Sequence, residues 1–409
     1  MHKLGGIAAI ILLLSCGPAA GDTPTYAVTF GARLVPGTAV ARAFIEVGQT
    51  EQRLEQLRLR APGSRYSRFV ADGPLQRDGD RVFWNPPADG GRLSYDVRVD
   101  NRRNDKGFDA LVADDHALFR GEDLFPPAAI SQMDGAESVS RLVMELPEGW
   151  RLLTAWPRDD DGGWQVRNPN RKFDRPTGWL AAGRLGIRRE QVAGIQVAVG
   201  GPPGRGVQRV SMLAMMRWTL PSLAALIPGD PPERLVVLSA GDPMWRGGLS
   251  GPNSLFIHAE RPLLSEDGTS TLLHELVHVL LPVAAAADHD WIDEGLAEYL
   301  TLRLLRDTDT ISARRYARSI ERFRRRSVGQ SLEGTTSSGA RTARAVVLFH
   351  DLDAELLAAS NGERGMPALA SALAAMPGPI DLATLVEAAR DVGGPRQYAS
   401  LAAADDARQ

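Results

Sequence analysis

The sequence contains a single cysteine, Cys16, among its 409 residues. Because no second thiol is present, an intramolecular disulfide is excluded. Long apolar runs are also missing, since after Ile7–Leu14 no stretch approaches the about 20 apolar residues of a membrane-spanning helix. Lys and Arg total 47 against 50 Asp and Glu, a formal net charge of −3, so the basic excess of a general nucleic-acid binder is absent and we expect no nucleic-acid partner.

The remaining composition is that of a globular protein, with 44% hydrophobic and 24% charged residues. A chain of 409 residues exceeds one ordinary hydrophobic core, which predicts two or three domains. The sequence gives no indication of the oligomeric state.

The N-terminus has the pattern of a targeting segment. Lys3 precedes the apolar run Ile7–Leu14, and small residues follow. Leu13–Cys16 resembles a bacterial lipobox, in which the cysteine is lipidated and becomes the new N-terminus, and the only cysteine of the chain lies at that position. The alternative is an ordinary secretory signal with an incidental cysteine. We expect residues 1–15 to be a lipoprotein signal peptide and residues 16–25 to be a tether.

Lipidation at Cys16 predicts a membrane attachment through acyl chains rather than through a helix. Gly17 follows the cysteine, and the resemblance therefore gives no sign of retention at the inner membrane. The expected location is the bacterial cell envelope, at the periplasmic face of the outer membrane.

Residues 26–155 alternate between apolar and polar positions, and turn signals such as Asp72-Gly73 and Asp78-Gly79 separate the runs. Short strands at this spacing predict a β-sandwich-like N-terminal domain, with a further strand pair around Glu148-Gly149. Residues 156–306 predict both strands and helices, with Ser254–His258 as an edge strand that can hold an extended peptide. Residues 307–409 predict a C-terminal helical region, so the fold class is α+β.

The motif His274-Glu-Leu-Val-His278 carries the strongest functional signal. On a helix, residues four apart lie about 40° apart around the axis, so both imidazoles point the same way. The surrounding helix is apolar, and paired histidines on a buried helix need polar partners, which a metal supplies. The pattern predicts zinc bound by His274 and His278, with Glu275 free to act as a general base on water.

A third ligand has to come from another element. On the helix expected from Asp290 to about Arg306, with Asp290 as its N-cap, Glu294 and Glu298 share one face. Either carboxylate can bind zinc while the other accepts the second N–H of a ligand histidine and so fixes its tautomer. The alternative for both is a solvated acidic face, which the apolar neighbours of these residues disfavour. His289, in a predicted loop, is a weak candidate.

These two helices resemble those of the gluzincins, and most closely the aminopeptidase N-type and glycyl aminopeptidase families. The second helix of those families typically reads W-x-x-E-G-x-x-x-Y, which Trp291, Glu294, Gly295 and Tyr299 match. The resemblance implies Glu294 as the third zinc ligand, one Zn²⁺ per chain, and a β-rich N-terminal domain (26–155) before a thermolysin-like catalytic domain (156–306). It also implies peptide or protein substrates. The PDZ module that often follows this catalytic domain has no counterpart after Ala359.

The sequence departs from the family pattern at two points. Gly248, Ser250 and Gly251 correspond to a substrate-binding loop, in which Ser250 replaces the glutamate that binds a free amino group. The family's catalytic tyrosine aligns with Thr342, counting back from Leu352-Asp353. Four residues are candidates to replace this oxyanion donor, each with an ordinary helical role as the alternative: Arg341, Arg344, Tyr316 and His350.

Three hypotheses follow from these patterns. The first is a lipid-anchored zinc peptidase that uses Glu275 as its base. The second is a catalytically weak or inactive zinc-containing lipoprotein that binds peptides, which the departures at Ser250 and Thr342 favour. The third is a purely structural lipoprotein without a metal.

Overall fold

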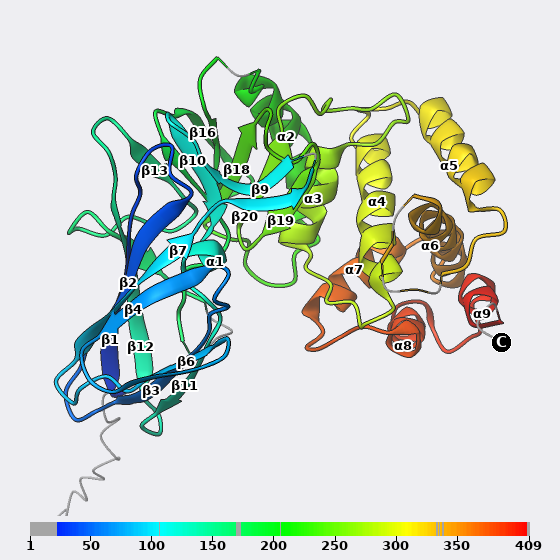
Figure 1. The fold of residues 1–409 in the computed structure, drawn as a ribbon. Coiled ribbons are helices and arrows are strands. Elements are labelled where there is room, and N and C mark those ends of the chain that lie inside the picture. Colours follow the sequence, from blue (N-terminus) through cyan, green and yellow to red (C-terminus); the bar gives the residue numbers. More distant parts are fainter. Residues whose placement is uncertain are drawn as a thin grey trace, which may run out of the picture.

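The computed structural model describes residues 23–406, except for positions 106, 169–172, 205, 333, 335 and 338. The predicted signal peptide, Cys16 and all but the last three residues of the predicted tether lie outside this range. Strands fill one end of the molecule and helices the other, with the N-terminal strand β1 and helix α9 at opposite ends (Figure 1). Among the described helices, none combines the length and apolarity that a membrane crossing requires.

Three sheets make up the N-terminal region. The six-stranded sheet has the order β14 (Trp164–Val166), β12 (Glu137–Glu145), β1 (Thr25–Arg33), β2 (Val40–Gly48), β7 (Gly91–Arg98), β4 (Tyr66–Ala71). The first five-stranded sheet has the order β13 (Arg151–Leu153), β15 (Trp179–Gly183), β10 (His116–Arg120), β9 (Gly107–Val112), β8 (Asn101–Asn104). The four-stranded sheet has the order β11 (Ala128–Gln132), β3 (Leu54–Arg60), β6 (Arg81–Trp84), β5 (Leu75–Asp78).

The fourth sheet begins the catalytic region predicted from the sequence. Its order is β16 (Gly186–Val192), β17 (Ile195–Gly201), β18 (Arg234–Ala240), β20 (Ser254–His258), β19 (Gly248–Gly251). Strands β17, β18 and β20 are parallel neighbours, whereas β16 and β19 run antiparallel at the two edges. The central strands are buried on both faces, which explains why they read as continuous apolar runs.

Helices complete the chain. They are α1 (Gly121–Leu124), α2 (Arg209–Ala224), α3 (Thr271–Leu280), α4 (Asp290–Asp307), α5 (Ala313–Ser327), α6 (Ala340–Ala359), α7 (Met366–Ala375), α8 (Leu382–Gly393) and α9 (Ala399–Asp406). Together with the sheets they confirm the predicted α+β class, with sheets first and a helical region last. The last helix, α9, lies within the region predicted as helical, although its short alanine-rich sequence has no clear helical period.

The buried side chains fall into three clusters. One fills the N-terminal sheets, and a second joins the fourth sheet to helices α2 through α9 without a break between the regions predicted as catalytic and C-terminal. The third, smaller cluster lies between the first five-stranded sheet and the fourth sheet, where the rings of Trp179 and Phe256 are 5.4 Å apart. The N-terminal sheets are therefore packed directly on the sheet that carries the candidate site.

Two details of the sequence prediction are wrong. Strand β20 is not an edge strand, because β19 pairs with its outer side. The strands on either side of Glu148-Gly149 do not pair with each other, since β12 joins the six-stranded sheet and β13 joins β15. Strand β15 pairs with β10, so one sheet contains strands from both sides of residue 155, and the domain boundary there stays a prediction.

Candidate metal centre

Helix α3 presents the motif residues at the surface of the large core. Ser270 caps its N-terminus by accepting the N–H of Leu273 at 3.4 Å, and the apolar residues of the motif, Leu276 and Val277, are buried. His274 and His278 then lie one turn apart on the face that looks toward α4. Their side chains are only 14% and 10% exposed.

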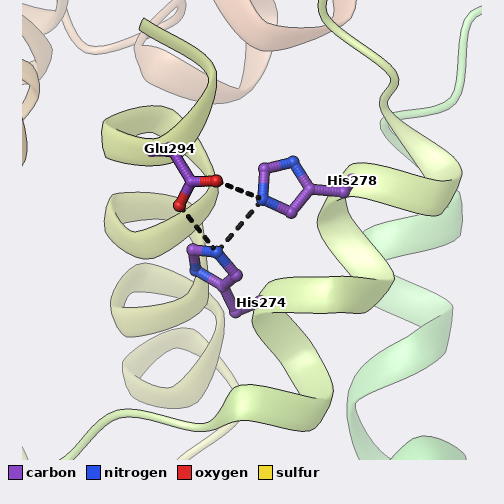
Figure 2. Close-up of side chains that lie close together, drawn as sticks. All are labelled: His274, His278 and Glu294. Atoms are coloured by element: carbon purple, nitrogen blue, oxygen red, sulfur yellow. Dashed lines mark hydrogen bonds and ion pairs between the residues drawn. The ribbon is translucent and has the colours of Figure 1, made fainter. Parts of the chain in front are cut away.

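The two imidazoles and Glu294 converge on one point (Figure 2). The Nε2 atoms of His274 and His278 lie 3.1 Å apart. The Glu294 carboxylate approaches them with distances of 3.3 Å to His274 and 3.8 Å to His278. Helix α4 therefore supplies the third candidate ligand at the position that the sequence resemblance implied.

A carboxylate of α4 contacts the Nδ1 atom of each histidine, on the side of the ring away from the paired Nε2 atoms. The Nδ1 atom of His274 lies 3.0 Å from Glu298, and that of His278 lies 3.0 Å from Asp293. When ionised, a carboxylate only accepts hydrogen bonds, so each pair places a proton on Nδ1 and turns Nε2 toward Glu294 and the other imidazole. The two Nε2 atoms face each other across the 3.1 Å gap.

This donor set fits zinc. Two nitrogens bound to a tetrahedral zinc at about 2.0–2.1 Å lie about 3.3–3.4 Å apart, close to the Nε2 separation seen here. Without a metal, a proton on His274 satisfies these groups, and a bound zinc ion would take the place of that proton. Within the part of the chain that the structure describes, His274, His278 and Glu294 form the one group whose ligand atoms all come within 4.8 Å of one another.

The charges around the histidines favour a cation. Burial by itself lowers the pKa of His274, but hydrogen bonds to Glu294 and Glu298 outweigh this effect and raise the pKa to about 10. For His278, burial likewise lowers the pKa, and the hydrogen bond to Asp293 outweighs it and raises the pKa. The three carboxylates of α4 thus create a negative potential that attracts either protons or a metal ion.

Glu275 lies beside this cluster with only 8% of its surface exposed. Burial raises the pKa of its carboxyl group, while the neighbouring His274 and His278 lower it in part. The backbone N–H of Ser250, on the edge strand β19, also donates to this carboxylate. A Cβ atom on Gly248 would lie 2.6 Å from the Glu275 side chain, so strand β19 packs directly onto it.

Strand β19 has one free edge in the described part of the fourth sheet. The N–H of His258 donates to Gly247, which identifies the hydrogen-bonded pairs of this antiparallel ladder. Since such pairs alternate, the main-chain groups of Gly248 and Ser250 point away from β20. These two residues can therefore bind a further extended chain, and the edge position expected for Ser254–His258 belongs to β19 instead. Gly251, at the end of β19, packs against Gly178 and Trp179.

The candidate oxyanion donors do not join the cluster. The hydroxyl of Tyr316 lies 3.2 Å from Nδ1 of His350. The centroid of the His350 ring lies 6.1 Å from that of Tyr316 and 6.1 Å from that of Tyr299, so both candidates pack beside Tyr299 and away from the zinc ligands. Arg341 donates to the carbonyl of Thr336, and the hydroxyl of Thr342 contacts Ser337 at 3.0 Å. The structure shows no contact between Arg344, half-buried on α6, and the cluster.

The start of α4 also differs from the expectation. His289, not Asp290, is the N-cap residue, and His289 contacts the carbonyl of Ala287 rather than the histidine pair. Asp290 is the first helical residue and accepts the backbone N–H of Ser337 at 2.7 Å.

Asp293 is the site residue that the sequence reading missed. Asp293 lies one residue from Glu294, about 100° around the helix, so it does not belong to the face that Glu294 and Glu298 share. The available signal is that two histidines need two supporting carboxylates, and that Glu298 can reach only one of them.

Comparisons with known proteins show that the chain has the fold of the zinc metallopeptidases called M1. An aminopeptidase N family protein from Idiomarina loihiensis matches with a TM-score of 0.67 at 15% identity, over 92% of this chain and 78% of that one. An M1 zinc metallopeptidase from Deinococcus radiodurans, in a variant bound to a Tyr-Ser-Ala substrate, matches with a TM-score of 0.63 at 15% identity, over 95% and 94% of the two chains. The same enzyme without this ligand matches at 0.61 and 16% identity, over 93% and 92%.

No protein-family model matches the sequence, and no curated protein is similar to it. The predicted aminopeptidase-like gluzincin fold is confirmed by the structural neighbours, whereas the missing PDZ module stays a prediction. At 15–16% identity, these neighbours establish the architecture and leave the activity to be argued from the site.

Proposed function

We propose that this chain is a zinc-dependent peptidase, anchored by a lipid at Cys16 in the bacterial envelope, that hydrolyses peptide bonds with Glu275 as its general base. The observation that carries the proposal is the geometry of the histidine pair. Both Nε2 atoms face each other at 3.1 Å, Glu294 completes the set, and an acidic residue, Glu275, lies beside it with no other ligand role. The M1 fold of the chain supports the same activity.

Zinc bound at this point would supply a Lewis acid that polarises a peptide carbonyl and lowers the pKa of water. His274, His278 and Glu294 would hold it. Glu298 and Asp293 keep the two imidazoles in the tautomer that binding requires, because each accepts the Nδ1 proton. The carboxylates of α4 also balance the charge of the cation.

Glu275 is placed to move the proton. Its carboxylate takes a proton from the attacking water and then gives one to the amine that leaves. The raised pKa of Glu275 suits this role, because a carboxylate whose pKa lies closer to neutrality is a stronger base. The backbone N–H of Ser250 holds the carboxylate in place, and so links the base to the strand that would bind the substrate.

A peptide substrate would bind as an extra strand along β19. The outward main-chain groups of Gly248 and the outward carbonyl of Ser250, whose N–H is directed to Glu275, offer hydrogen bonds that do not depend on the peptide's side chains. Gly248 leaves the room that both Glu275 and a passing chain require, since a side chain there would overlap Glu275. The substrate of the proposed reaction is therefore a peptide or protein in extended conformation. The Deinococcus radiodurans neighbour was bound to Tyr-Ser-Ala, and a two-domain M1 zinc metallopeptidase variant was bound to L-tryptophan, in agreement with this kind of ligand.

The decisive experiment measures metal content and peptide cleavage in the wild type and in Glu275→Gln. Metal analysis of the wild type should give one zinc per chain, and a peptide library should be cleaved. Glu275→Gln should keep the zinc and lose most of the cleavage, because glutamine cannot accept the proton. Cleavage that persists in this variant would remove Glu275 from the mechanism. Zinc without cleavage by the wild type would support the peptide-binding alternative, and the absence of zinc would refute both.

The lipid anchor rests on the sequence around Cys16 and needs its own test. We expect the full chain expressed in a bacterial host to separate with the outer-membrane fraction and Cys16→Ser to be released as soluble protein. Equal membrane association of both forms would contradict the anchor without affecting the proposed chemistry.

A further inference from the structure

We propose that Asp353, a buried carboxylate of α6, is a positioning residue that sets the rotation of α4 and thereby the place of the carboxylates around the zinc. This inference rests on the proposed function. Asp353 lies on the opposite side of α4 from the histidines and contacts none of the candidate ligands.

Helix α4 packs with one face against α3 and with another face against α6. Glu294 and Glu298 point toward α3, where they meet the histidines. The next residue in each case, Gly295 and Tyr299, lies about 100° further around the axis and faces α6. Glu294 and Glu298 are thus each adjacent in sequence to a residue that contacts α6.

The first contact is close packing. A Cβ atom on Gly295 would lie 2.3 Å from the Cβ of Ala345 and 3.2 Å from the ring of Phe349, so glycine allows α4 and α6 to approach closely here. Figure 1 shows α6 beside α4 in the helical region. This contact fixes the separation of the two helices at one point of α4.

The second contact restricts that rotation. One turn later, the hydroxyl of Tyr299 donates to the Oδ2 atom of Asp353 at 2.6 Å, and Arg303 pairs with the same oxygen. The other oxygen of Asp353 accepts the backbone N–H of Met366 at 2.6 Å, at the start of α7. Asp353 is 4% exposed and Tyr299 is 1% exposed, so water does not replace these bonds. A single carboxylate therefore ties α4 to both α6 and α7.

The expected effect on the site follows from helix geometry. A glutamate carboxylate lies about 6 Å from its helix axis, so a rotation of about 10° moves it by about 1 Å. Metal–ligand distances tolerate changes of only about 0.2 Å. Loss of the Tyr299–Asp353 bond should therefore displace Glu294 and Glu298 by more than a zinc site accepts without a loss of affinity.

The test compares Tyr299→Phe and Asp353→Asn with a matched control, Glu355→Gln. Glu355 is also an α6 carboxylate that binds the N-terminus of another helix, through the N–H groups of Ala399 and Ser400, but it does not contact α4. Zinc affinity is measured by competition with a chromophoric chelator. The visible absorption spectrum of the cobalt(II)-substituted protein reports the ligand geometry. Thermal unfolding of the metal-free proteins reports stability.

We expect Tyr299→Phe and Asp353→Asn to weaken zinc binding by about threefold to tenfold, less than the 10- to 100-fold of a group that contacts a ligand directly. Their cobalt spectra should differ from that of the wild type, whereas Glu355→Gln should match it. Variants that lose thermal stability but keep wild-type zinc affinity and cobalt spectrum would overturn the inference and leave the proposed function intact. A wild-type chain that binds no zinc would overturn both.

Discussion

Gly248→Ala should separate the catalytic step from metal binding. The added Cβ would lie 2.6 Å from both Cγ and Oε1 of Glu275 and 2.8 Å from a methyl group of Thr271. Gly248 does not have a positive φ, so the new side chain acts through this contact and not through backbone strain. The histidines and Glu294 lie outside the contact.

The size of the effect follows from these distances. Ordinary carbon contacts begin near 3.4 Å, so Glu275 or β19 must move by about 0.8 Å, the difference between 3.4 and 2.6 Å. A misplacement of about 1 Å in a catalytic group costs about 100-fold in rate. We expect kcat to fall by about 30- to 100-fold, with a loss of about 1–3 kcal/mol in stability from overpacking.

The assay measures peptide cleavage, zinc content and denaturant unfolding for Gly248→Ala and for a control, Gly48→Ala. Gly48 ends strand β2, and its Cβ would meet only Ala27 at an ordinary 3.6 Å. The control should behave like the wild type. Gly248→Ala should keep one zinc per chain. A variant with wild-type kcat would refute the close packing of β19 on Glu275, and one that loses its zinc would refute the separation of the base from the metal ligands.

Three further predictions concern the carboxylates that support the histidines, the pH dependence of zinc binding and the contact at Gly107. Asp293→Asn and Glu298→Gln should each weaken zinc binding by about 10- to 100-fold in chelator competition, and wild-type affinities would contradict their roles. Because the pKa of metal-free His274 is raised to about 10, a proton occupies it at neutral pH and has to leave before zinc binds. Apparent zinc affinity should therefore rise by about tenfold per pH unit for each displaced proton between about pH 6 and 9, and a flat titration would contradict this competition. Backbone hydrogen bonds of Phe108 join the hairpin β8–β9 to the segment around Trp245, before β19. Gly107→Ala would place a Cβ atom 2.9 Å from the Cα of Trp245 at this contact. We expect the substitution to lower the free energy of unfolding in denaturant by about 1–3 kcal/mol, with zinc retained.

Local patterns were sufficient for the elements and for part of the site. The helix predicted to carry the motif is observed as α3 over Thr271–Leu280, because an apolar period and a serine cap act within a few residues. The relative position of His274, Glu275 and His278 also follows from the helical repeat alone. The choice of Glu294 over Glu298 as a ligand came from the family resemblance, since the repeat places both on one face.

The order of the strands in the fourth sheet could not be predicted from these local patterns. The run Ser254–His258 is apolar and regular, whereas the edge strand β19 is short and rich in glycine. Which of two neighbouring strands lies outside depends on pairing between distant segments, and no local period encodes it.

The sequence by itself determined the histidine pair, the place of Glu275 between them and the helices that carry them, because each depends on residues within one or two helical turns. Only the tertiary structure decided which carboxylate supports which histidine, that Ser250 and Gly248 meet Glu275, and that Asp353 contacts the far side of α4. Those relations join residues 15 to 54 positions apart, and their distances are set by the packing of whole helices and strands against a shared core.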